Sequence, residues 1–148
     1  MIALLDTNVL IRFLTHDKDK KYKKLYAFFE SLELGEMRIE LKLIVLFQVI
    51  FVLKSFYRVP KEQIVAGLTD LLKYKGITIK EKKIVQQALD LWREENVEIV
   101  DCYLVTCLEK DTQNILYRYD RNFDKLKINQ RALTMIESII NSSDHDIN

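Results

Sequence analysis

The residues of this chain that are best suited to chemistry are aspartates that follow short apolar runs. Asp6 comes directly after the run IALL (2–5), and Asp120 lies three residues beyond NILY (114–117). Apolar runs of this length are typical of buried strands, and the site of a parallel sheet lies beyond the carboxyl ends of its strands. We therefore expect the carboxylates of Asp6 and Asp120 to converge.

Scarcity of other residue types excludes several kinds of active site. With 3 glycines the chain has no glycine-rich phosphate loop, and its 2 histidines, His16 and His145, lie in polar surroundings. No serine stands in a GxSxG motif, and Cys102 and Cys107 match neither a CxxC redox pair nor a zinc spacing. Nucleophilic triads and histidine-rich zinc sites are not expected, so acidic residues are what remains for catalysis.

Composition and charge place the chain among ordinary globular proteins. Its 148 residues are 49% hydrophobic, which supports a single domain over residues 1–140 and a frayed tail over 141–148. The formal charge of +1 predicts no general attraction to nucleic acid. The apolar run 43–53 is too short to span a membrane, which takes about 20 residues. We expect a cytoplasmic protein.

The spacing of apolar residues indicates an α/β fold in which short strands alternate with helices, so that a parallel sheet is covered by helices on both faces. Thr7 or Asn8 is expected to cap the first helix. The expected strands are 2–5, 38–41, 77–79 and 114–117. The expected helices are 9–15, 20–32, 43–57, one from Pro60, 81–96, one near Asp101, and 132–140.

Gln48 interrupts the most apolar segment of the chain. The predicted helix 43–57 is apolar enough to be buried on most sides. An unpaired buried amide costs about 1 to 3 kcal/mol, so Gln48 must find a hydrogen-bond partner. It either serves a site or faces a gap in the packing.

Four segments together resemble a PIN domain, most closely the VapC-type toxins of prokaryotic toxin-antitoxin pairs. They are LLDTNVLIRFL (4–14), VLKSFYRVPKEQI (52–64), DCYLVTCLEK (101–110) and ILYRYDRNFDKL (115–126). The resemblance covers residues 2 to about 128. It implies a three-layer α/β/α sandwich with a short central parallel sheet, whose carboxylates bind Mg²⁺ or Mn²⁺ and cleave RNA phosphodiesters.

By position, the resemblance implies that Asp6, Asp101 and Asp120 are metal ligands. A glutamate of the family falls on Gln48, so that the site keeps an oxygen but loses a charge. Hard divalent cations prefer oxygen ligands, and a carboxylate cluster repels itself until a dication neutralises it. We therefore expect weakened metal binding at this site.

Other positions of the resemblance carry supporting roles. Thr7 and Asn8 are placed to hold Asp6 by hydrogen bonding. Asn122 stands where the family often has a further aspartate, and Arg118 stands where it usually has a small hydroxyl residue. Arg118 and Arg12 are candidates for contact with the RNA.

The sequence leaves two functional hypotheses. The first is a metal-dependent ribonuclease of reduced activity, a toxin with an antitoxin partner and a homodimeric state. The second is a catalytically silent module that binds RNA or a protein. An aspartyl-phosphate enzyme would need an acid where Asn8 stands. The lysine clusters 18–24 and 73–83 are candidate phosphate contacts, although a solvated helix face explains them as well.

Overall fold

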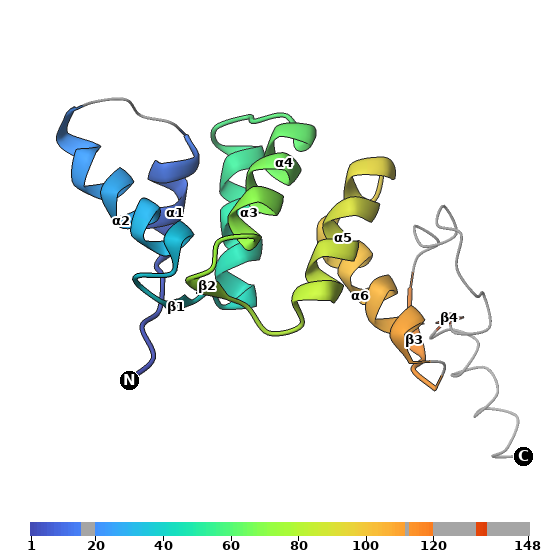
Figure 1. The fold of residues 1–148 in the computed structure, drawn as a ribbon. Helices are drawn as coiled ribbons and strands as arrows, with labels where there is room; N and C mark the ends of the chain where they lie inside the picture. Colours follow the sequence, from blue (N-terminus) through green and yellow to red (C-terminus); the bar gives the residue numbers. More distant parts are fainter. Residues whose placement is uncertain (16–19, 112, 120–132, 136–148) are drawn as a thin grey trace, which may run out of the picture. The chain divides into compact units, whose positions relative to one another are not determined.

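The computed structural model describes residues 1–15, 20–111, 113–119 and 133–135. Helices alternate with short parallel strands along the chain, which confirms the predicted α/β class (Figure 1). The chain divides into two compact units, residues 1–83 and 84–148. Within the described ranges, every helix is too short or too polar to cross a membrane.

The first unit holds four α-helices, one short 3-10 helix and a short sheet. Its elements are α1 (Thr7–Leu14), η1 (Lys20–Tyr22), α2 (Lys23–Leu34), β1 (Ile39–Glu40), α3 (Leu43–Ser55), α4 (Lys61–Leu72) and β2 (Ile77–Thr78). The helix α5 (Lys82–Glu94) leads into the second unit, which continues with α6 (Ile99–Lys110), β3 (Leu116–Arg118) and β4 (Leu133–Met135). The domain prediction for residues 1–140 stays a prediction, and 141–148 lie outside the described residues.

The sheet of the first unit has β1 in its centre. β1 pairs in parallel with β2, in a register that sets Glu40 opposite Thr78. On the other side of β1, Leu4 forms a parallel bridge with Glu40. The predicted strand 2–5 is thus reduced to one bridge, but it runs alongside β1 in the predicted direction.

Two glycines of the first unit lie where a side chain would strain the backbone or collide with it. Gly35 ends α2 in the left-handed region at φ 81°, where a residue without a Cβ is unstrained. Gly76 precedes β2, and a Cβ at this position would lie 2.0 Å from the carbonyl oxygen of Met37. β2 can approach the end of α2 this closely only because residue 76 is glycine.

The helix α3 is buried on one side only. The prediction that this helix is buried on most sides was therefore wrong. Leu46, Val49 and Leu53 are buried, whereas Ile44 is 77% exposed and Phe51 is 68% exposed. Composition indicated an apolar helix correctly. It could not indicate how many neighbouring elements would cover that helix.

The second unit contains a further parallel strand pair. β3 pairs with β4, and Leu116 lies opposite Leu133. The predicted helix 132–140 is therefore wrong at residues 133–135, which form a strand; residues 136–140 lie outside the described residues. A short apolar segment fits a helix or a strand, and the pairing with β3 decides between them.

Candidate functional site

Asp6 stands where the first chain segment leaves the sheet and enters a helix. Leu5 is buried, Asp6 is exposed, and α1 begins at Thr7. Asp6 has the extended backbone of an N-cap (φ −83°, ψ 151°), yet its carboxylate forms no capping hydrogen bond with the described amides of α1. Helix capping is thus not what occupies this carboxylate in the structure.

Thr7 connects this strand end to α3. Its hydroxyl donates a hydrogen bond of 2.8 Å to Oε1 of Gln48, which is 41 positions away in the chain. Thr7 is 9% exposed, so its hydroxyl depends on this partner. The prediction that Thr7 or Asn8 caps α1 was wrong, because α1 begins at Thr7, Asp6 is the N-cap residue, and the Thr7 side chain turns to α3.

The same hydrogen bond gives Gln48 the partner that the sequence required. Gln48 lies in the second turn of α3 and is exposed, so its amide also reaches solvent. Its carbonyl oxygen can accept a hydrogen bond or face a cation, but it carries no net charge. The first unit therefore links the Gln48 amide to Thr7, the residue that follows Asp6.

The remaining predicted ligands belong to the second unit. Asp101 is in the first turn of α6 and is half-buried. Asp120 and Asn122 lie outside the described residues. Among the residues that are described, no three acidic, histidine or cysteine side chains are grouped as ligands of a metal ion. The predicted meeting of Asp6, Asp101 and Asp120 stays a prediction.

The two arginines that were assigned to the substrate lie on different elements. Arg12 is exposed on α1, where its Nη1 donates a hydrogen bond of 2.6 Å to the Tyr22 hydroxyl. Its guanidinium carbon also lies 5.4 Å from the centre of the Tyr22 ring. Arg118 is half-buried on β3, and Asn8 is exposed on α1.

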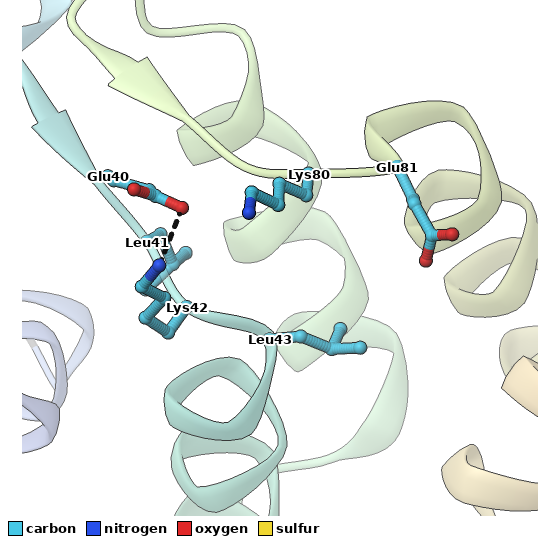
Figure 2. A pocket seen from close by; sticks show the side chains of 6 residues that line it. All are labelled: Glu40, Leu41, Lys42, Leu43, Lys80 and Glu81. Atoms are coloured by element: carbon cyan, nitrogen blue, oxygen red, sulfur yellow. Dashed lines mark hydrogen bonds and ion pairs between the residues drawn. The ribbon is translucent and has the colours of Figure 1, made fainter.

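A cavity of about 340 Å³ lies beyond the carboxyl ends of β1 and β2 (Figure 2). Sequence reasoning did not predict it. It is lined by Glu40, Leu41, Lys42, Leu43, Lys80 and Glu81. The Lys42 Nζ lies 2.9 Å from Oε1 of Glu40, and this hydrogen bond holds the pKa of the Glu40 carboxyl below its ordinary value. The signal that could have found the cavity is the position of Lys42, which follows a predicted strand just as Asp6 does.

The described site of the first unit is thus an exposed aspartate at the start of α1, followed by a threonine that contacts α3. The PIN domain family matches residues 3–129 of this chain, which is most of its 148 residues. The chain therefore belongs to the PIN domain family, a family of nucleases that are generally metal-dependent. No curated protein matches the chain.

Proposed function

We propose that this protein is a metal-dependent ribonuclease that cleaves RNA phosphodiesters and whose activity is reduced by Gln48. The observation that carries the proposal is the hydrogen bond between Thr7 and Gln48. It brings position 48 of α3, where a glutamate of the family falls, to the residue that follows Asp6. Two of the four proposed positions thus belong to the first unit and are linked through Thr7.

The donor set fits a hard divalent cation. Asp6, Asp101 and Asp120 offer carboxylate oxygens, and Gln48 offers a carbonyl oxygen, which are the ligand types that Mg²⁺ and Mn²⁺ prefer. When bound, such an ion activates water and neutralises charge that develops at the phosphoryl group.

The protein's own residues set the strength of this site. Thr7 fixes the Gln48 amide through its hydrogen bond, while Asn8 and Asn122 are proposed to orient the carboxylates. The loss of one charge at position 48 lowers metal affinity, and changes around metal sites cost about 10 to 100-fold in affinity or activity. This accounts for the reduced activity in the proposal.

Arg12 and Arg118 are the proposed contacts to RNA phosphates. The planar guanidinium binds phosphate through two parallel hydrogen bonds. Arg12 is already ordered by the Tyr22 hydroxyl and ring, so less conformational freedom is lost when it binds a phosphate.

The resemblance to VapC-type toxins supplies the biological part of the proposal. The nuclease would act as a cytoplasmic toxin, an antitoxin would cover its acidic site, and the active form would be a homodimer. Light scattering coupled to gel filtration measures the dimer directly, and a monomer at every concentration would contradict it.

A cleavage assay tests the proposed activity. The wild-type protein and the Asp6→Asn variant are incubated with structured RNA and Mn²⁺, and we expect cleavage only by the wild type. Asp70→Asn, which changes an exposed acid on α4, is the matched control and should retain activity. Equal cleavage by the wild type and Asp6→Asn would contradict the proposal, because a contaminating nuclease would explain it.

A catalytically silent module is the second candidate function, and the neutral amide at Gln48 favours it. Titration calorimetry with Mn²⁺ at neutral pH separates the two candidates. Micromolar affinity supports the nuclease, whereas absence of binding heat together with absence of cleavage supports the silent module.

A further inference from the structure

We propose that the cavity beyond β1 and β2 binds a backbone phosphate of the RNA through Lys42 and Lys80, beside the proposed cleavage site. This inference rests on the proposed function, because it assigns a subsite to the same substrate. It is carried by the sheet register, the lining of the cavity and the orientation of its charged side chains.

The sheet places Asp6, Lys42 and Lys80 just beyond three neighbouring segments. Leu4 lies opposite Glu40, and Glu40 lies opposite Thr78. Asp6, Lys42 and Lys80 each follow one of these paired positions by two residues. The backbone stays extended at Asp6 and at Lys42, whereas Lys80 lies in the turn that follows β2.

Adjacent strands of a sheet are about 4.8 Å apart. Lys42 thus follows the strand next to the segment that ends at Asp6, and Lys80 follows the strand after that one. A polynucleotide that presents one phosphate at Asp6 has its neighbouring phosphates within reach of these long side chains. The cavity of about 340 Å³ between them has room for a phosphate group.

The charged groups at the cavity leave a net cation facing the opening. Lys80 extends toward the pair formed by Glu40 and Lys42, and Glu81 directs its carboxylate away from both lysines (Figure 2). The charges that face one another are therefore two ammonium groups and one carboxylate. The Lys42 side chain is 45% exposed, so a phosphate can reach it from solvent.

Glu40 is the competitor of the phosphate in this arrangement. It accepts the hydrogen bond of Lys42, and the positive charges of Lys42 and Lys80 both favour its ionised form. The Glu40 side chain is 13% exposed whereas that of Lys42 is 45% exposed, so a phosphate reaches the ammonium group from solvent and competes with the carboxylate for it. Removal of the Glu40 charge should therefore strengthen RNA binding.

Salt dependence of RNA binding gives the direct test. Anisotropy of a labelled single-stranded RNA is measured in EDTA, which prevents cleavage, between about 50 and 200 mM salt. Each phosphate contact contributes roughly 0.7 to the slope of log K against log salt for single strands. We expect the Lys42→Ala and Lys80→Ala double variant to bind more weakly, with a slope smaller by about 0.7, because the two lysines bind one phosphate.

Lys54 and Lys61 provide the matched control, because Lys54 lies in the last turn of α3 and Lys61 begins α4, both outside the lining of the cavity. Their double alanine variant loses the same charge and should retain the wild-type slope. The Lys42→Arg and Lys80→Arg double variant should retain it as well.

Glu40→Gln supplies a test with the opposite sign, since it should raise RNA affinity several-fold in the same assay. Wild-type RNA binding and cleavage with an unchanged slope in the Lys42 and Lys80 alanine variant would overturn this inference alone. The inference would also be overturned if the cavity variant and the control variant lost the same amount of salt-dependence slope. RNA binding would then depend on the total charge of the protein and not on the cavity. A wild-type protein that neither binds nor cleaves RNA would overturn the proposed function as well.

Discussion

At the scale of single residues, the Gln48 amide links α3 to the start of α1 through its hydrogen bond with Thr7. Its oxygen accepts the Thr7 hydroxyl at 2.8 Å, next to the position of Asp6. A glutamate at position 48 could accept the same hydrogen bond and would add a negative charge. The structural role and the electrostatic role of this position are therefore separable by substitution.

Gln48→Glu should raise the affinity for Mn²⁺ by about 10 to 100-fold, because it returns a charged oxygen to the proposed metal site. Titration calorimetry measures this change, and RNA cleavage should increase with it. Gln63→Glu is the matched control, since Gln63 is exposed in the first turn of α4. Equal Mn²⁺ affinity in the wild type and Gln48→Glu would show that position 48 does not face a metal ion.

Thr7→Val should lower the free energy of unfolding by about 0.5 to 1.5 kcal/mol, because it removes a hydrogen bond of a buried hydroxyl. Urea denaturation measures the loss. A double-mutant cycle with Gln48→Met isolates the contact, and a coupling of at least about 0.5 kcal/mol is expected for partners in contact. Strict additivity would mean that the two side chains do not interact in solution.

At the scale of elements, sequence patterns were reliable where local spacing decides the structure. Strands at 38–41 and 77–79 appear as β1 and β2, and the parallel pairing follows from the alternation of helices and strands. Distant partners decided the rest. The Thr7 hydroxyl donates its hydrogen bond to Gln48 of α3 and not to a group of its own helix. Residues 133–135 form a strand that pairs with β3.

Gly76→Ala should lower the free energy of unfolding by about 1 to 3 kcal/mol, because backbone near Met37 must move to admit a Cβ. Gly67→Ala is the counterpart within α4, where the Cβ would meet Leu14 Cδ2 at an ordinary 3.5 Å. It should stabilise the protein by about 0.5 to 1 kcal/mol through helix propensity. Thermal or urea unfolding of both variants measures the contrast, and the same sign for both would contradict the close approach at Gly76.

At the scale of the whole molecule, the four proposed positions are divided between two stretches of the sequence. Asp6 and Gln48 belong to residues 1–83, while Asp101 and Asp120 belong to residues 84–148. Strand ends singled out Asp6 and Asp120 as candidates, and the family resemblance added Asp101 and Gln48. The cavity with Lys42 and Lys80 was not predicted, because it depends on a register between strands that local spacing does not determine.

If Asp6 and Asp101 bind the same ion, their substitutions should have coupled effects on the affinity for Mn²⁺. Asp6→Asn and Asp101→Asn should each weaken Mn²⁺ binding, and the double variant should lose less than the sum of the two effects on the binding free energy, since ligands of one ion act together. Asp70→Asn combined with Asp101→Asn should be additive, because Asp70 is an exposed residue of α4 outside the proposed site. Additive losses for both pairs would place Asp6 and Asp101 at separate sites.

A crystal structure with an anomalous-scattering map, from crystals soaked in Mn²⁺, tests the central claim most directly. The account predicts a Mn²⁺ peak in contact with carboxylate oxygens of Asp6, Asp101 and Asp120, and a stronger peak in Gln48→Glu crystals. Aspartates that lie on separate surfaces, with no peak among them in either protein, would contradict it.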